Sequence, residues 1–312
     1  MSNLFIDIET YSHLDLPQVG TYRYAEDCEV ILAGWAVDDG PVTVSEDHTE
    51  LLKAMARHPG RIVAHNANFE RAVLTPLYES SGDEALPVSR WYCTMAQALA
   101  HSLPGSLDAL GRFLGLSEDQ RKLADGKALI KLFCMPQRGG ARLTAADRPE
   151  EWARFREYQR LDVEAMRECF HRMPTVNYPA AGDRELRYWH LDQRINDRGF
   201  LVDQQLCHGA IEACAGEKKH LDDAVKRITG GALRSATQRE ALQKWLATEC
   251  GVYLEDMRAK TIENAVAAGG VDDAALELLN ARRDVSRSST AKYKRVLEAV
   301  NSDGRLRGGT QF

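Results

Sequence analysis

The sequence predicts an α/β domain with a mixed sheet and flanking helices, followed by a mostly α-helical region. Three observations support this fold class. Strand-like segments alternate with helical ones before Ser106, helical spacing dominates after it, and a stretch rich in turn residues at 174–182 (PTVNYPAAG) separates the two parts. We therefore expect one domain over residues 1–175 and a second, helical one over residues 183–312.

The first three strands follow from hydrophobic pattern and turn chemistry. Leu4–Glu9 alternates, so Asp7 and Glu9 share one face of a strand. Glu29–Val37 is β-rich and nearly all apolar, as in a central strand. The tight-turn residues 38–40 (DDG) lead into Pro41–Val44, which predicts a hairpin.

Helices and strands then alternate, which is typical of an α/β domain with a mixed sheet. Leu51–Ala56 and Asn68–Leu77 are predicted to be helices, and Arg61–Ala64 and Val88–Cys93 are predicted to be strands.

From Ser106 onward helical spacing prevails. Leu107–Leu114 is a short helix that ends at a glycine, and Thr144–Met173 has the strongest helical pattern in the chain. Its apolar positions recur at helical spacing: Trp152, Phe155, Val163, Met166 and Phe170. Pro149 suits the first turn of this helix.

The second region reads as a series of helices. Arg184–Asn196 is amphipathic and runs through a glycine turn into a short extended segment at 200–203. Further helices are expected at Gln204–Ile228, Thr237–Thr248, Ala259–Ala267 and Asp272–Val300. The last residues, 308–312 (GGTQF), predict no closing element.

Composition excludes several classes of protein. The 312 residues are 44% hydrophobic and 28% charged, with a formal net charge of −6 at pH 7, which argues against a protein that merely coats nucleic acid. The sequence shows neither a membrane-spanning run nor a secretory signal. Its seven cysteines lack CxxC spacing and indicate reduced thiols, so we expect a cytoplasmic protein.

Basic residues are concentrated near the C-terminus. A local track of this kind can contact phosphates in spite of a negative total charge, and a solvated helix face is the equally weighted alternative. The track consists of Arg282, Arg283, Arg287, Lys292, Lys294, Arg295, Arg305 and Arg307.

Three short segments carry the residues suited to metal-dependent chemistry. Asp7 and Glu9 are two apart on a strand, and their charges need neutralising by metal ions or by buried arginines. Tyr158 and Asp162 are four apart on the long helix and share one face, although a core tyrosine beside an exposed acid would give the same pattern.

Asn66 and Glu70 have the same spacing at the start of a helix. Glu70 would add a carboxylate, and Asn66 would bind a nucleotide or brace the site. Ordinary helix capping by Asn66 or Asn68 is the alternative.

In this order, the Asp-x-Glu, Asn-x-x-Phe-acid and Tyr-x-x-x-Asp segments resemble the three motifs of the DEDDy branch of the DEDD exonuclease superfamily. The resemblance implies a ribonuclease-H-like fold and 3′→5′ exonuclease activity. It implies two Mg²⁺ ions, replaceable by Mn²⁺, bound by four acids: Asp7, Glu9, Glu70 and Asp162. Tyr158 would position the attacking water, and the substrate would be bound by Thr10, Asn66 and Phe69.

One departure from the family pattern is Glu70, since the second motif usually ends in aspartate. Glutamate is one methylene longer and reaches a metal only if the backbone stands further away, so the resemblance leaves catalytic competence open.

The rest of the chain resembles the region after the exonuclease in phage-type family A DNA polymerases. Leu191–Asp203 resembles the link that follows the exonuclease, and Arg283–Arg307 resembles the thumb, with Arg283 and Lys292 as DNA contacts. No palm motif follows, so the chain is predicted to stop before the palm and not to synthesise DNA alone. The resemblance implies single-stranded DNA 3′ ends and primer–template as partners, together with a palm-containing chain. If phage-encoded, the protein would act in the cytoplasm of a bacterial host.

The sequence predicts a proofreading exonuclease module of a DNA polymerase and leaves two alternatives open. One is an RNA-trimming DEDDy exonuclease. The other is a catalytically weakened subunit that binds DNA or supports a split polymerase.

Overall fold

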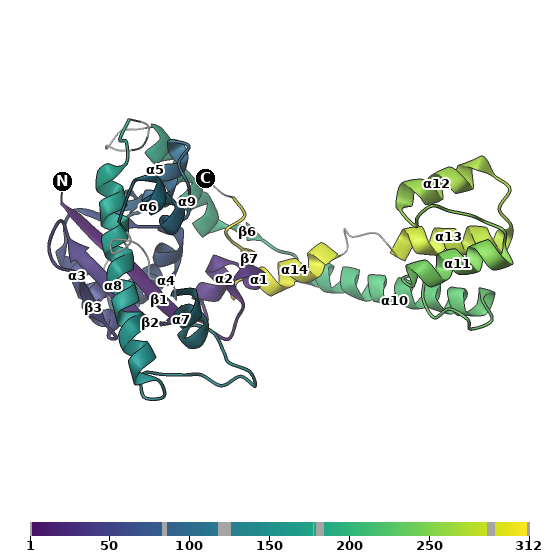
Figure 1. Cartoon of the computed structure of the whole chain (residues 1–312), viewed down its shortest axis with the longest axis horizontal. Helices are drawn as coiled ribbons and strands as arrows, with labels where there is room; N and C mark the ends of the chain where they lie inside the picture. The colour runs from purple at the N-terminus through teal and green to yellow at the C-terminus, as the bar shows by residue number, and fades with distance from the viewer. Residues whose placement is uncertain are drawn as a thin grey trace. The chain divides into compact units, whose positions relative to one another are not determined.

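A computed structural model describes residues 2–82, 86–117, 126–176, 178, 184–285 and 291–310. The chain divides into two compact units (Figure 1). The sheet unit comprises Met1–Val202 and Ala299–Phe312, and the helical unit comprises Asp203–Glu298. The predicted α/β class with a mixed sheet is confirmed for the first unit.

A five-stranded sheet of order β3-β2-β1-β4-β5 forms the centre of the sheet unit. β1 (Asn3–Tyr11) pairs antiparallel with β2 (Glu29–Val37), which pairs antiparallel with β3 (Thr43–Ser45). On its other side β1 pairs parallel with β4 (Arg61–Ala64), which pairs parallel with β5 (Trp91–Cys93). The predicted hairpin is present, with its second strand at Thr43–Ser45 rather than Pro41–Val44, and β4 has the predicted bounds.

One predicted strand was too long. Residues 88–93 were expected to be extended, but Val88–Arg90 forms a short 3₁₀ turn, η1, and only the last three residues are a strand. Pro87 precedes this turn, and the Arg90 guanidinium donates to the Gly60 carbonyl, so the segment is fixed by local contacts rather than by a ladder.

Helices surround this sheet. Before the long helix they are α1 (Leu16–Val19), α2 (Thr21–Ala25), α3 (His48–Arg57), α4 (Asn68–Ser80), α5 (Thr94–Ala100), α6 (Leu107–Phe113) and α7 (Gly126–Phe133). The sequence did not predict α1, α2, α5 or α7. The predicted long helix is α8 (Pro149–Arg172), with Pro149 in its first turn.

α8 crosses the sheet against β1 and β2 (Figure 1). Val163 and Met166 of α8 are buried in the main core with Leu4, Ile6 and Ala33 of the sheet. Burying this apolar stripe fixes the helix against the central strand, and so aims the polar residues on the same turns at β1.

The helical unit has its own small core. It contains α10 (Gln204–Ile228), α11 (Arg239–Glu249), α12 (Ala259–Ala268), α13 (Asp273–Val285) and α14 (Ala291–Ala299, whose last residue lies in the sheet unit). Leu242, Leu246 and Leu278 are fully buried there. The predicted helix at 272–300 corresponds to α13 and α14, and residues 286–290 between them lie outside the described residues.

Residues around the expected domain boundary belong to the sheet unit. The predicted turn stretch lies partly outside the described residues, and α9 (Arg184–Arg198), which follows it, is part of the sheet unit. The compact units divide after Val202 instead. The assignment of residues 1–175 and 183–312 to an exonuclease and a thumb stays a prediction.

Residues 308–310 form no helix or strand, as expected, but the short strand that precedes them was not predicted. β7 (Arg305–Leu306) pairs antiparallel with β6 (Phe200–Leu201), and the Asn196 amide donates to the Thr310 carbonyl. Gly199 precedes β6 with φ 58°, and a Cβ there would lie 2.5 Å from the Leu306 carbonyl oxygen. Only glycine permits this close approach of the two strands.

Among the described residues, no helix is both long enough and apolar enough to cross a membrane. All seven cysteines are free thiols, as predicted.

Candidate metal centre

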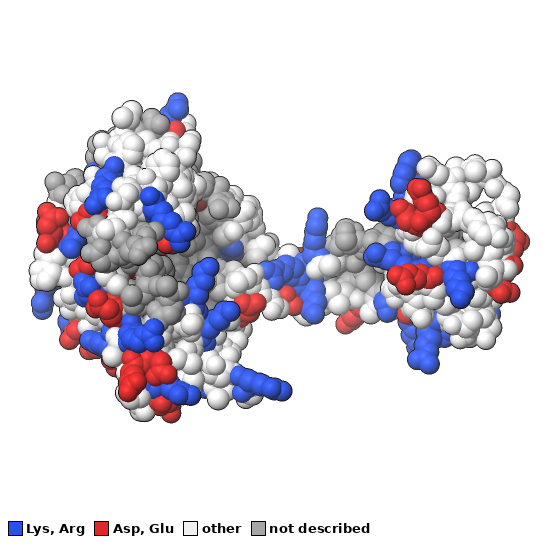
Figure 2. Space-filling view, in the orientation of Figure 1, with Lys and Arg blue, Asp and Glu red and all other residues white. Residues whose placement is uncertain are grey.

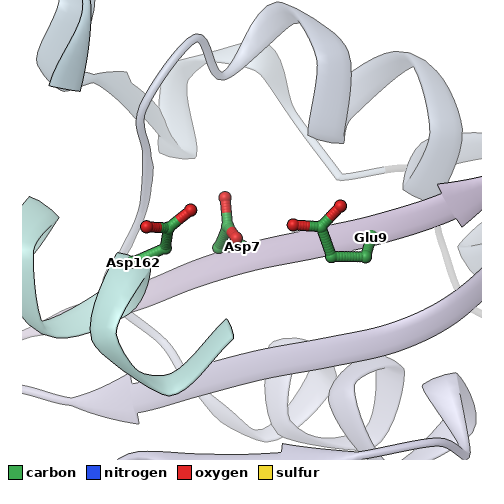
Figure 3. Close-up of side chains that lie close together, drawn as sticks. All are labelled: Asp7, Glu9 and Asp162. Carbon is green, nitrogen blue, oxygen red and sulfur yellow. The ribbon is translucent and has the colours of Figure 1, made fainter. Parts of the chain in front are cut away.

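Three carboxylates predicted to act together do lie together. Asp7 and Glu9 project from one face of β1, and Asp162 projects from α8 towards them (Figure 3). One oxygen of each carboxylate lies within 4.8 Å of an oxygen of each of the others. The strand period of two and the crossing of α8 over β1 produce this grouping.

The donor set of this trio suits a hard divalent cation. Three carboxylates at this spacing repel one another, and two of the three are only half-buried while Asp162 is buried. Oxygen ligands alone are the preference of Mg²⁺ and Ca²⁺, whereas no histidine or cysteine belongs to the group. The residues present therefore fit a magnesium-type site.

Glu70 stands beside the trio without belonging to it. It lies in the first turn of α4, is 3% exposed, and its Oε2 has no hydrogen-bond partner among the described residues. Burial, then the charges of Asp7 and Glu9, raise the pKa of Glu70 well above its usual value. A buried carboxylate so close to two others is costly when ionised, and a cation would remove that cost.

Tyr158 is fully buried, with its hydroxyl near the same acids. Burial is the largest cause of its raised pKa, followed by the charge of Asp162. The phenol is therefore a proton donor at neutral pH. The ring packs against the first residue of α7, Gly126, where a Cβ would lie 2.1 Å from Tyr158 Cε2.

Two residues that the sequence did not single out contact the trio. The side-chain amide of Gln159 donates to Asp7, and the Cys134 thiol donates to Glu9 Oε2 at 3.5 Å. Burial and the charge of Glu9 raise the pKa of Cys134, so the thiol stays protonated. Gln159 had one signal in the sequence, because it is a polar residue between Tyr158 and Asp162 on an otherwise apolar helix face.

A cavity of about 300 Å³ adjoins the trio at Glu9. Its wall includes two of the predicted substrate-binding residues, Thr10 and Phe69, together with the ring of Tyr24 and apolar residues from α1 and α7. Thr10 and Tyr24 share a hydrogen bond of 3.0 Å, and the Phe69 and Tyr24 rings pack with centroids 6.0 Å apart. The cavity thus joins an apolar wall to a carboxylate.

The remaining predicted binding residues do not line this cavity. Asn66 adopts φ 68° and lines a different, 230 Å³ cavity with Asn68 and Asn196. The helix after it has Ala67 at its N-cap and no side-chain cap, so the capping alternative was wrong. Arg283 and Lys292 lie in the helical unit, so they belong to a separate region.

Four of the eight basic residues of the track, including Arg307 with Asp303, pair with nearby acids, which favours the solvated-face alternative for these four. Lys294 and Arg295 both pair with Glu298 on α14, and Arg283 pairs with Asp284. Figure 2 shows Lys and Arg interspersed with Asp and Glu on the visible surface.

Arg282 differs from the rest of the track. It is 5% exposed, and neither an ion pair nor a hydrogen bond joins it to any residue that the structure describes. Burial and the neighbouring charge of Arg239 lower its pKa. Both arginines line a 440 Å³ cavity at the N-terminal ends of α11 and α12. Three acidic residues, Glu240, Glu255 and Asp256, also line this cavity, but among the described residues none of them forms an ion pair with Arg282.

Comparison with known proteins identifies a relative along the whole chain. No protein-family model matches. The DNA polymerase of Bacillus phage SP02 is 33% identical over 326 aligned residues, which cover all of this chain and 48% of that polymerase. The chain thus spans about half the length of the curated relative it matches.

A polymerase domain of known structure shares the fold. It is the POL domain of Pol1 from M. smegmatis in complex with DNA primer-template and dNTP, with a TM-score of 0.53 and 16% identity. The match covers 98% of this chain and 48% of that one. The chain is therefore homologous over its whole length to part of a phage DNA polymerase.

Proposed function

We propose that this chain is a two-metal-dependent 3′→5′ exonuclease of the proofreading type, acting on single-stranded DNA 3′ ends as part of a DNA polymerase. The observation that carries the proposal is the trio Asp7, Glu9 and Asp162, drawn from two elements far apart in sequence onto one side of β1. We assign the sheet unit to the ribonuclease-H-like DEDDy group, and homology to a phage polymerase supports that assignment.

In this proposal the four acids hold two Mg²⁺ ions, or Mn²⁺ in their place. When bound, the ions activate a water and neutralise charge on the leaving 3′ oxygen. Tyr158 keeps its proton because its pKa is raised, so its hydroxyl orients the attacking water by hydrogen bonding. The cavity beside Glu9 receives the terminal nucleoside, with Phe69 and Tyr24 packing against the base.

The helical unit supports the DNA part of the proposal. A buried guanidinium without a partner is expensive unless an anion completes it. A backbone phosphate has the required charge and geometry, and arginine binds it through two parallel hydrogen bonds. We assign the Arg282 cavity to such a contact in a thumb-like role.

The test is digestion of a 3′-labelled single-stranded DNA, with and without EDTA, by the wild type and by the double variant Asp7→Ala with Glu9→Ala. We expect metal-dependent loss of the 3′ label and a fall of at least about 10³-fold in the double variant, because metal ions supply several kcal/mol of transition-state stabilisation. Unchanged digestion by the double variant contradicts the proposal. The same assay on labelled RNA distinguishes the RNA-trimming alternative, and wild-type inactivity on both favours the weakened-subunit alternative.

A further inference from the structure

The side chain of Gln159 makes two hydrogen bonds to a single residue of the trio. It is fully buried on α8, immediately after Tyr158 and one turn before Asp162. Its Nε2 donates to the Asp7 backbone carbonyl at 2.7 Å and to Asp7 Oδ2 at 2.9 Å. Both the position of the β1 backbone and the orientation of the carboxylate are therefore fixed by one amide.

The orientation of this amide follows from the chemistry of its neighbours. Both contacted Asp7 atoms are acceptors, so the NH₂ end of Gln159 must face them. The opposite atom, Oε1, is buried and has no hydrogen-bond partner among the described residues. The amide is thus held by Asp7 alone, rather than by a wider network that includes Asp7.

The neighbouring strand leaves room for this contact. Gly34 on β2 is the register partner of Asp7. A Cβ at position 34 would lie 3.0 Å from Gln159 Nε2 and 3.0 Å from Val163 Cγ2. A methyl group there would press the amide away from Asp7. The contact between Gln159 and Asp7 therefore depends on glycine at position 34.

We propose that Gln159 is a positioning residue, which holds the Asp7 carboxylate in the orientation that binds a divalent cation. A neutral donor can do this without changing the charge of the site. It occupies one lone pair of Oδ2 and so sets the direction in which the carboxylate faces. The inference deepens the proposed function, and it concerns metal binding rather than hydrolysis.

The test measures binding of Mn²⁺ alone to the full chain, by calorimetry and by the electron paramagnetic resonance signal of free Mn²⁺. The variant Gln159→Leu removes the donor. We expect its Mn²⁺ affinity to fall by about 10- to 100-fold, the usual effect of losing a group that orients a metal ligand. Gly34→Ala keeps all the acids and Gln159 itself but presses the amide away from Asp7, and is expected to weaken Mn²⁺ binding by a smaller factor.

Gln97→Leu is a matched control. Gln97 is also fully buried on a helix of the sheet unit, donates once to the Pro174 carbonyl at 3.0 Å, and has an unpartnered Oε1. If burial alone matters, Gln97→Leu will weaken Mn²⁺ binding as much as Gln159→Leu, and the inference is overturned. The inference is also overturned if Gln159→Leu and Gly34→Ala both bind Mn²⁺ with the affinity of the wild type.

Failure of the proposed function can be told apart from failure of the inference. A wild type that binds Mn²⁺ but digests neither DNA nor RNA contradicts the exonuclease, while the Gln159 effect on affinity still stands or falls by itself. A wild type that binds no Mn²⁺ overturns both.

Discussion

The two compact units each bury an arginine, and they treat it differently. In the sheet unit Arg71 is buried with Asp197 as its ion-pair partner, and its guanidinium also donates to Tyr22 and Gln193. In the helical unit Arg282 is equally buried, but no described residue pairs with it. A buried charge that only stabilises the fold, as we infer for Arg71, has a partner within the protein. A buried charge without such a partner, as at Arg282, is a candidate for binding a ligand.

The two units also differ in the sign of the charges at their candidate binding sites. The sheet unit gathers carboxylates at β1 and α8, where they repel one another and a bound cation would stabilise them. The helical unit keeps a cation that only an anion can neutralise. Under the proposed function the sheet unit would bind a cation and the helical unit a phosphate, and each of three experiments can break or sharpen this contrast.

The largest effect is expected in the sheet unit, from Tyr158→Phe. Loss of the hydroxyl removes the group that orients the water, so the hydrolysis rate should fall by roughly 10²-fold while Mn²⁺ affinity stays unchanged. Single-turnover digestion and calorimetry measure the two quantities. Tyr11→Phe is the control, because Tyr11 is a buried tyrosine of β1 whose hydroxyl has no partner among the described residues. A similar loss in both variants would reduce Tyr158 to a packing residue.

An intermediate effect is expected in the helical unit, from Arg282→Met. Losing one phosphate contact should weaken DNA binding by roughly tenfold and reduce the slope of log affinity against log salt by about 1. Fluorescence anisotropy with labelled DNA at several salt concentrations measures both. Removing a buried unpaired charge should also raise stability by on the order of 1 kcal/mol.

Arg227→Met is the control in the same unit, since Arg227 is exposed and paired with Glu277 at 2.7 Å. If Arg282→Met destabilises the protein and leaves DNA affinity intact, Arg282 is structural and the contrast between the units disappears.

The smallest effect is a pH-dependent change in stability from Glu70→Gln, measured by denaturant unfolding in EDTA. The folded-state pKa of Glu70 is raised above its ordinary value of 4.5, so folding favours the protonated form and stability falls as pH rises through the raised pKa. Glutamine carries no charge, so the variant should be more stable at pH 8 by on the order of 1 kcal/mol. The difference should vanish below pH 4.5.

Glu79→Gln, at an exposed position of the same helix, is the matched control. Saturating Mg²⁺ should reverse the order of wild type and Glu70→Gln, because the glutamate then gains a cation. If the wild type is more stable than Glu70→Gln at pH 8 without metal, the ionised Glu70 side chain does not destabilise the fold, and this prediction is wrong.

Much of the sheet and the acid trio could be predicted from short segments. The alternation at Leu4–Glu9 places two acids on one face, and the spacing of Tyr158 and Asp162 places both on one side of a helix. Both placements follow from local periodicity. The same periodicity places Leu4 and Val163 in the core, so the fold keeps the acids on the predicted faces.

The contacts around the trio could not be predicted in this way. Gln159 meets Asp7 only because α8 crosses β1 at one register, and Cys134 meets Glu9 only because α7 ends beside it. The place of Asn66 depends on a positive φ that its sequence neighbours do not require. Such contacts depend on how the elements pack together, and hydrophobic periodicity in the sequence carries no information about them.

The pairing of β6 with β7 makes the helical unit an insertion. The chain leaves the sheet unit after Val202 and re-enters it at Ala299, and the Val202 amide donates to the Gly304 carbonyl at 3.0 Å. The exit and re-entry points are therefore held together by the β6–β7 pair, and both strands belong to the sheet unit. Replacing residues 203–298 by a short glycine–serine loop is therefore expected to cost little entropy and to leave the sheet unit as one continuous chain.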